Sequence, residues 1–252
     1  MDEKTINVNN LKINYKTFWE KWKEVFLILH GWWGSSDSWV EVAKLLSKKF
    51  FVIVPDLPWF GKTPLDKVYT LSDYANFVKD FLKKLNIDDI ILLWHSNGWA
   101  ISICLVWKIK IKKLILNNSA WIRKKTKTSL KRKIFWFFVK PLKFLRNLPW
   151  WEKLRIIFYK LIDSRDYLDA EKNPFKRQTF LNMINTDLQE QIQNINIPTL
   201  LIRWKHDTYT PLEDGKKMHK LIKNSELKII DSTHWIHLKK PKELVDVILN
   251  LI

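Results

Sequence analysis

Hydrophobic and polar positions along the chain follow two different periodicities. Short apolar runs, such as Val25–Leu29 and residues 51–54, indicate buried strands. Between such runs, segments such as 71–85 carry apolar residues at helical spacing on one face. This alternation predicts an α/β architecture with a mostly parallel sheet. The predicted strands are 5–8, 11–16, 25–29, 51–54, 90–93, 114–116, 199–202 and 227–230, and the predicted helices are 38–48, 71–85, one starting at 97, and 242–252.

The alternation is interrupted between residues 121 and 190. This segment is rich in Lys, Arg and Phe, has helical spacing and shows no clear strand pattern. We therefore expect residues 1–120 to form the first part of a core, residues 121–190 an inserted helical cap, and residues 191–252 the second part of the core. A chain of 252 residues is long enough for one sizeable core of this kind.

Three polar segments that follow predicted strands carry candidate chemistry. In IILLWHSNGW (90–99), a strand runs through Ser96 into a helix, so a hydroxyl would stand at a sharp turn beside a helix N-terminus. Asp207 follows the strand at 199–202, and His234 follows the strand at 227–230. Sites in α/β proteins form where parallel strands end. Serine, then acid, then histidine is also the chain order of one known catalytic triad.

These segments together resemble the α/β-hydrolase family, specifically its capped branch of esterases, cofactor-free haloperoxidases and meta-cleavage-product hydrolases. The resemblance covers essentially the whole chain and implies an eight-stranded type of sheet with helices on both faces. The strand-to-helix turn around Ser96 departs from the family's G-x-S-x-G pattern, because Trp94 stands where that pattern has its first glycine. The segments that carry the resemblance are LHGWWGSSDSW, VIVPDLPWFGKT, LLWHSNGW, PTLLIRWKHDTYTP and STHWIHLKKPKEL.

The resemblance implies a role for each of these residues. Ser96 would be the nucleophile, His234 its base and Asp207 the residue that orients the base. The backbone N–H groups of Trp32 and Asn97 would form the oxyanion hole. The implied activity is that of a carboxylesterase-like hydrolase, which cleaves a small ester or acyl substrate through an acyl-enzyme. It needs no metal and no organic cofactor. Carbon–carbon bond hydrolysis and perhydrolysis would use the same triad.

One histidine competes with His234 for the role of base. His237 lies three residues further along the chain, whereas His234 lies nearer the end of the preceding strand. We therefore prefer His234 on position alone.

The charge of the chain leaves a second class of function open. The net charge is +18, and residues 121–160 hold 13 Lys or Arg against one acid. We interpret this segment as a solvated face. The alternative is a non-catalytic protein whose basic cap binds an anionic surface such as a membrane. No nucleic-acid recognition motif accompanies the charge. A single cysteine, Cys104, and a polar N-terminus predict a cytoplasmic location.

The counts of tryptophan and glycine are abnormal. The chain has 15 Trp and 5 Gly, whereas average usage predicts roughly 18 glycines. We hypothesise that UGA codons, read as glycine in the source organism, were translated here as tryptophan. Bulky residues at tight turns would then cause local strain. By contrast, Trp32 and Trp39 are plausible tryptophans for the family. The positions concerned are Trp19, Trp22, Trp33, Trp59, Trp94, Trp99 and Trp204.

Overall fold

The computed structural model describes residues 1–19, 23–32, 34–119, 173–186, 188–207 and 210–251. The chain divides into two compact units, Met1–Ile122 with Thr186–Ile252, and Arg123–Asn185. Most of the predicted cap lies outside the described residues, as does the basic segment 121–160, so the cap boundaries stay a prediction. Within the predicted cap, the structure describes helix α7 (Pro174–Asn185). Helix α8 (Gln189–Gln193) crosses the predicted end of the cap and belongs to the first unit.

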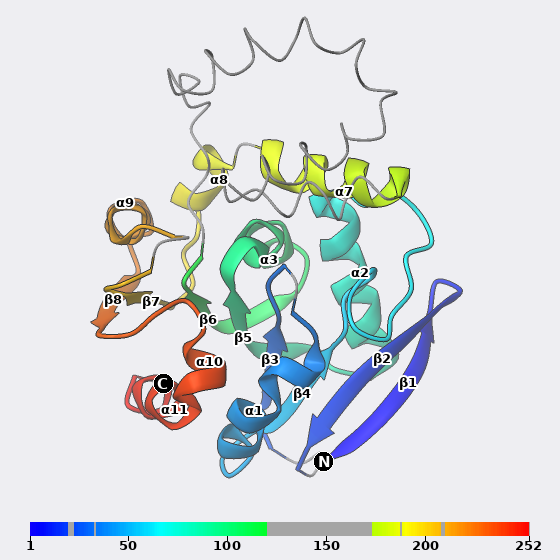
Figure 1. The fold of residues 1–252 in the computed structure, drawn as a ribbon, viewed down its shortest axis with the longest axis horizontal. Coiled ribbons are helices and arrows are strands. Elements are labelled where there is room, and N and C mark those ends of the chain that lie inside the picture. Colours follow the sequence, from blue (N-terminus) through cyan, green and yellow to red (C-terminus); the bar gives the residue numbers. More distant parts are fainter. Residues whose placement is uncertain (20–22, 33, 120–172, 187, 208–209, 252) are drawn as a thin grey trace, which may run out of the picture. The chain divides into compact units, whose positions relative to one another are not determined.

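The first unit is built on a single sheet (Figure 1). Its strand order is β1-β2-β4-β3-β5-β6-β7-β8. The pairs β1–β2 and β2–β4 are antiparallel, and every other neighbouring pair is parallel. The predicted mostly parallel, eight-stranded sheet is therefore confirmed. The strands are β1 (Asp2–Val8), β2 (Leu11–Phe18), β3 (Val25–Leu29), β4 (Phe51–Pro55), β5 (Asp89–His95), β6 (Lys110–Asn117), β7 (Thr199–Trp204) and β8 (Ser225–Ile230).

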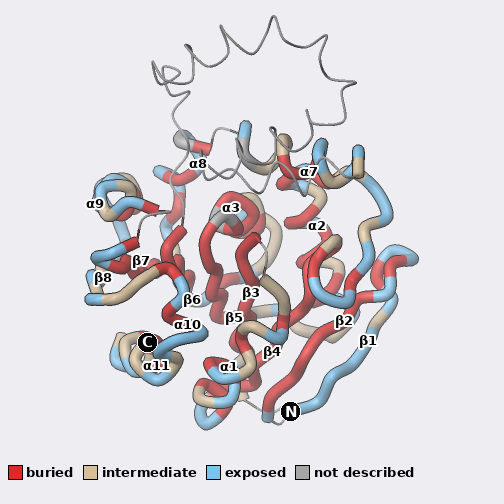
Figure 2. Tube along the Cα trace, in the orientation of Figure 1, coloured by how far each residue is buried: buried red, intermediate tan, exposed pale blue. Residues whose placement is uncertain are grey.

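Helices cover both faces of this sheet (Figure 1). Helices α1 and α11 pack together on one face, and α2 and α3 pack together on the other. The central strands between them are almost entirely buried (Figure 2). This arrangement follows from the continuous apolar runs of β3 and β5, which are buried on both sides. The helices of this unit besides α8 are α1 (Val40–Leu46), α2 (Leu71–Lys84), α3 (Trp99–Val106), α9 (Leu212–Leu221), α10 (Ile236–Lys239) and α11 (Pro241–Leu249).

Helix α2 shows how local sequence sets an element. Thr70 precedes it, and the Thr70 hydroxyl accepts a hydrogen bond from the backbone N–H of Asp73 at 3.1 Å. In return, the Asp73 carboxylate accepts one from the backbone N–H of Thr70 at 2.9 Å. This reciprocal cap fixes the start of the helix. Its buried face carries Tyr74, Phe77 and Phe81 at the spacing that the sequence pattern predicts.

Helix α9 was not predicted from the sequence. Its segment, LEDGKKMHKL, is charged and has a glycine in its middle, which weakens the helical signal. The structure explains that glycine. A Cβ at Gly215 would lie 2.5 Å from the Cγ atom of the buried Arg203 side chain on β7. The residue that obscures the helix in the sequence therefore lets the helix approach the sheet.

Several of the questioned tryptophans occupy backbone or packing environments typical of glycine. Trp19 and Trp59 have positive φ angles of 73° and 85°, which a bulky residue adopts only at a cost. A Cβ at Gly98 would lie 1.0 Å from Nε1 of the fully buried Trp94. Trp204 corrects an expectation, because it lies at the end of β7 without a positive φ, not in a turn. Glycine at these positions stays a prediction.

We expect Trp94→Gly to stabilise the protein. Replacing a buried tryptophan ordinarily costs about 3–5 kcal/mol of unfolding free energy. Here, removing the indole should instead gain about 1–3 kcal/mol, because its buried Nε1 has no hydrogen-bond partner within the described residues. Urea unfolding of the wild type and the variant measures the difference.

Trp39→Gly is the matched control for this prediction. Trp39 is also fully buried, but the family resemblance accepts a tryptophan there. We expect Trp39→Gly to lose the usual several kcal/mol. An equal loss at both positions, or UGG codons at 94, 99 and 204, would contradict the recoding hypothesis.

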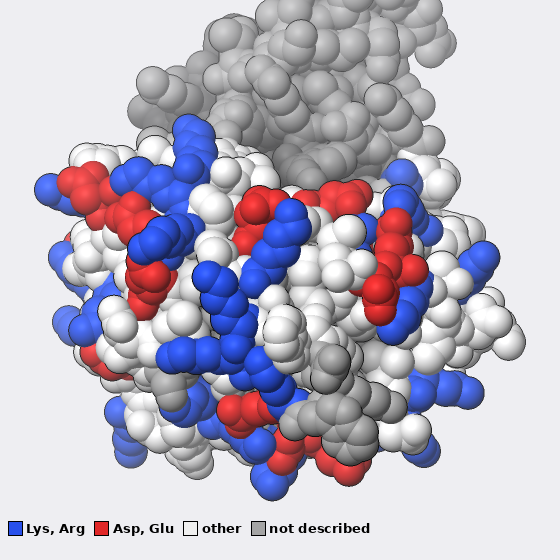
Figure 3. Space-filling view, turned by 90° about the horizontal axis from the view of Figure 1, so that it is seen from below, with Lys and Arg blue, Asp and Glu red and all other residues white. Residues whose placement is uncertain are grey.

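The described surface carries mixed charge. On the face that Figure 3 shows, Lys and Arg side chains lie among Asp and Glu side chains. Pairs such as Lys44–Glu41 and Lys216–Glu213, each 2.7 Å apart, lie one helical turn apart on exposed faces. In the described part of the chain, no helix has both the length and the apolar character needed to cross a membrane.

Candidate active site

Ser96 lies at a strained turn between β5 and α3. β5 ends at His95, and a short 3₁₀ turn from Ser96 to Gly98 leads into the helix. The φ angle of Ser96 is 58°, a left-handed conformation that non-glycine residues rarely adopt. A nucleophilic serine at a strand-to-helix elbow has this strained backbone, which turns its hydroxyl out of the sheet.

The loop after β3 lies directly against this serine. A Cβ added to Gly31 would stand 2.9 Å from the Cβ of Ser96 and 2.9 Å from the carbonyl oxygen of His95. Only a glycine allows the two backbones to approach so closely. The His-Gly turn and the serine turn, 65 positions apart in the sequence, are therefore neighbours in space.

Asp207 and His234 form a buried hydrogen-bonded pair. Nδ1 of His234 lies 2.7 Å from Oδ2 of Asp207, and both residues are buried. An ionised carboxylate only accepts hydrogen bonds, so Nδ1 carries the proton. In this tautomer Nε2 carries no proton and is the basic nitrogen, as a general base requires.

The imidazole of His234 lies beside the serine turn. The ring centroids of His234 and His95 are 4.9 Å apart, and Nε2 of His95 lies 3.3 Å from the carbonyl oxygen of His234. Since His95 directly precedes Ser96, the structure brings the three residues chosen from the sequence to one region at the carboxyl ends of β5, β7 and β8.

Two residues that the sequence analysis missed hold Asp207. Thr210 donates from its backbone N–H to Oδ1 at 3.0 Å and from its hydroxyl to Oδ2 at 2.6 Å. The side-chain amide of Asn118 also donates to Oδ2. Burial opposes ionisation of this carboxyl, but hydrogen bonds from His234 and Thr210 outweigh it and lower its pKa. Asp207 is therefore an anion at neutral pH.

These two residues left only weak signals in the sequence. Asn118 follows β6, and no sequence pattern marked its amide as a partner of Asp207. Its side-chain oxygen also accepts from the backbone N–H of Trp204 at 3.0 Å, so it links the ends of β6 and β7. Thr210 stands three residues after Asp207, a spacing common in local turns that an aspartate side chain stabilises.

The rival base, His237, has a different environment. Its ring stacks on Trp39 with centroids 4.5 Å apart, and burial lowers its pKa to about 3. Within the described ranges, its Nδ1 has no hydrogen-bond partner. Burial, together with neighbouring His237 and His234, also holds the pKa of His95 well below the usual range. The geometry thus favours His234 as the base and leaves the other two rings neutral.

Comparison with known proteins agrees with this fold. A family model described as alpha/beta hydrolase fold matches residues 24–147. The chain has the α/β-hydrolase fold. It is 24% identical to the uncharacterized hydrolase YugF of Bacillus subtilis over 97% of this chain and 96% of that protein. It is 26% identical to the pimeloyl-[acyl-carrier protein] methyl ester esterase of Wigglesworthia glossinidia brevipalpis, over 85% and 88% of the two chains.

A solved structure supports the fold of this α/β-hydrolase. The thermophilic esterase from Thermogutta terrifontis superposes with a TM-score of 0.73 at 18% sequence identity, covering 99% of this chain and 97% of that one. At this level of identity the likeness concerns the fold alone.

The residues expected to form an oxyanion hole in this α/β-hydrolase come from the two segments that meet at Ser96. Trp32 follows Gly31, whose backbone lies against the serine. Asn97 follows Ser96 within the 3₁₀ turn at the start of α3. Their backbone amides thus come from the two segments that meet at the serine, and their roles remain a proposal.

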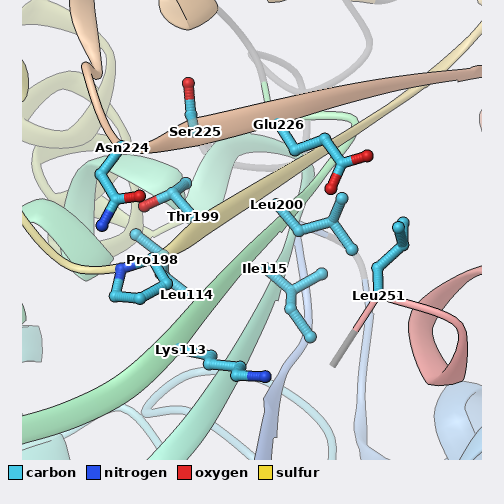
Figure 4. A pocket seen from close by; sticks show the side chains of 10 residues that line it. All are labelled: Lys113, Leu114, Ile115, Pro198, Thr199, Leu200, Asn224, Ser225, Glu226 and Leu251. Atoms are coloured by element: carbon cyan, nitrogen blue, oxygen red, sulfur yellow. The ribbon is translucent and has the colours of Figure 1, made fainter.

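One hollow of this α/β-hydrolase lies at the amino ends of β7 and β8 (Figure 4). Thr199 and Ser225, the first residues of β7 and β8, line it together with Leu251. Asp207 and His234 follow the opposite ends of the same strands, so this hollow is separate from the candidate site. Within the described ranges, no group of three or more His, Cys, Asp or Glu side chains is arranged to hold a metal ion.

Proposed function

We propose that this α/β-hydrolase is a serine hydrolase that cleaves an ester or related acyl bond. Ser96 is the nucleophile, His234 the general base and Asp207 the residue that orients the base. One observation carries this proposal. A buried histidine donates to a buried carboxylate at 2.7 Å beside a serine held at a positive φ. This combination is the arrangement that activates a serine hydroxyl.

The proposed reaction has two halves. The Ser96 hydroxyl attacks the carbonyl carbon of the substrate while its proton passes to Nε2 of His234. The carbonyl oxygen becomes an oxyanion and accepts hydrogen bonds from the backbone N–H groups of Trp32 and Asn97. The protonated His234 then gives its proton to the leaving alcohol, whose bond to the carbonyl carbon breaks. In the second half, water attacks the acyl-enzyme in the same way and releases the acid.

The aspartate stabilises the charge that develops on the base. When His234 takes the proton from Ser96, its ring becomes a cation next to the Asp207 carboxylate. The lowered pKa of Asp207 keeps that carboxylate ionised for this purpose. Hydrogen bonds from Thr210 hold it in place, so the ring keeps one orientation through both halves of the reaction.

Two of the similar proteins favour esters as the substrate class. Those from Wigglesworthia and Thermogutta are both named esterases. We therefore propose carboxylesterase-like activity for this chain.

Labelling with a fluorophosphonate probe tests the nucleophile directly. We expect one label per chain and peptide mapping that places it on Ser96, because an activated serine reacts much faster than an ordinary hydroxyl. The Ser96→Ala variant, incubated with the probe in the same way, should give no label. A label on another serine would contradict the assignment of Ser96.

A further inference from the structure

His30 is a buried histidine whose two ring nitrogens both contact backbone groups. It directly follows β3 and is 1% exposed. The backbone N–H of Leu57 lies 3.1 Å from Nε2, so Nε2 is an acceptor and carries no proton. The proton of the neutral ring is therefore on Nδ1, which lies 2.9 Å from the carbonyl oxygen of Gly31 and donates to it. Burial lowers the pKa of His30, which keeps the ring neutral.

The carbonyl of Gly31 is fixed from two sides. Besides His30, the backbone N–H of Gly34 donates to it at 3.1 Å. The peptide bond from Gly31 to Trp32 is trans, so its C=O and N–H groups point in opposite directions. Fixing the carbonyl of Gly31 therefore fixes the direction of the N–H of Trp32. This peptide adjoins Ser96, because Gly31 lies against the serine side chain.

Leu57, whose backbone N–H donates to Nε2 of His30, lies in a loop that further hydrogen bonds hold in place. Leu57 follows Asp56, whose carboxylate accepts from the backbone N–H of Ser36 at 2.6 Å and of Lys62 at 2.9 Å. These bonds connect the loop after β4 to the turn before α1. The Phe60 ring also packs on the imidazole in a T-shaped arrangement, with centroids 5.3 Å apart. His30 thus connects a fixed loop to the peptide that precedes Trp32.

We infer that His30 is a positioning residue that aims the backbone N–H of Trp32 at the oxyanion. This inference rests on the proposed function. A donor aimed at the oxyanion stabilises the transition state more than the bound substrate. Disturbing its aim should therefore lower kcat and leave KM nearly unchanged.

Two substitutions separate the two hydrogen bonds of His30. In His30→Asn, the amide nitrogen can take the place of Nδ1 and still donate to Gly31. In His30→Gln, the amide oxygen can take the place of Nε2 and still accept from Leu57. We expect kcat to fall about 10-fold or more in His30→Gln, below the 10²–10³ cost of deleting an oxyanion donor. In His30→Asn we expect a loss of less than about 3-fold, because the bond to Gly31 remains.

A transition-state analogue gives a second readout. A trifluoromethyl ketone adds to Ser96 as a hemiketal whose oxyanion occupies the same hole. Its affinity should fall in His30→Gln by the same factor as kcat. A loss confined to His30→Asn, or equal losses in both variants, would overturn the inference, because either result would mean that the bond to Gly31 does not set the rate.

A third test uses the wild type alone, so it does not depend on whether a variant folds. ¹⁵N NMR of the His30 ring at pH 7 should show Nδ1 protonated and Nε2 unprotonated. The opposite tautomer, or a cationic ring, would overturn the inference. The proposed function is tested separately by comparing ester hydrolysis by the wild type and Ser96→Ala. Equal rates there would overturn both, whereas a Ser96-dependent rate that His30→Gln leaves unchanged would overturn only the role of His30.

Discussion

Replacing Ser96 with alanine is expected to lower kcat/KM for short p-nitrophenyl esters by about 10⁴-fold or more. The variant lacks the hydroxyl that forms the acyl-enzyme, so only catalysis by the surrounding donors remains. Alanine and serine have similar tolerance for the φ of 58° at this position, so the fold should persist. Steady-state rates with acetyl and butyryl esters, together with thermal unfolding, measure the two effects separately.

Ser119→Ala is the matched control for this comparison. Ser119 is also buried and follows the neighbouring strand β6, and within the described residues its hydroxyl has no hydrogen-bond partner. We expect its variant to keep the wild-type rate within about 3-fold. If Ser96→Ala hydrolysed esters as fast as the wild type and Ser119→Ala, the chain would not be a Ser96-dependent hydrolase.

The second large effect is expected for Asp207→Asn. A neutral amide at position 207 cannot stabilise the His234 cation as a carboxylate does. Its NH2 group can also donate to Nδ1, which favours the tautomer with the proton on Nε2, where it cannot accept the proton of Ser96. We therefore expect kcat to fall by about 10⁴-fold with KM nearly unchanged. Asp214→Asn on α9 is the control, because Asp214 contacts Lys217 at 3.6 Å and no triad residue by hydrogen bond or ion pair. A loss below about 10-fold in Asp207→Asn would argue against its role as the orienting acid.

The same variant should change how stability depends on pH. The pKa of Asp207 is lower in the folded protein than the 3.8 of an ordinary aspartate side chain. The ionised carboxyl therefore stabilises the fold above pH 3.8, and this contribution is lost as the pH falls through the lower, folded pKa. We expect Asp207→Asn to be less stable than the wild type at pH 7, with the difference shrinking toward pH 2. Urea unfolding at both pH values measures it.

The sheet could be predicted from the sequence because its strands are continuous apolar runs between turns. Val25–Leu29 was predicted with the bounds that the structure shows. The order of Ser96, Asp207 and His234 pointed to a common sheet edge, because parallel strands end together. Helix α9 was missed because Gly215 lowers the helical signal of its segment. The glycine is there because a larger side chain would clash with Arg203.

The partners of the candidate triad were harder to foresee. Asn118 and Thr210 bind Asp207 through short polar side chains, which look like ordinary turn residues in a sequence. His30 and His95 both precede a functional turn, and nothing in the sequence tells which ring nitrogen contacts which backbone group. Such contacts depend on distances between segments that only the folded chain brings together.

The candidate nucleophile and its base occupy parts of the sheet with different resistance to opening. Ser96 follows β5, which has a parallel neighbour on each side, whereas His234 follows β8, which borders the sheet of the described residues beside β7 and is partly exposed along its length. Fraying of a border strand costs less than disrupting the interior. We therefore expect a local, reversible opening of the last strand to abolish activity at temperatures below those at which the region around the serine unfolds.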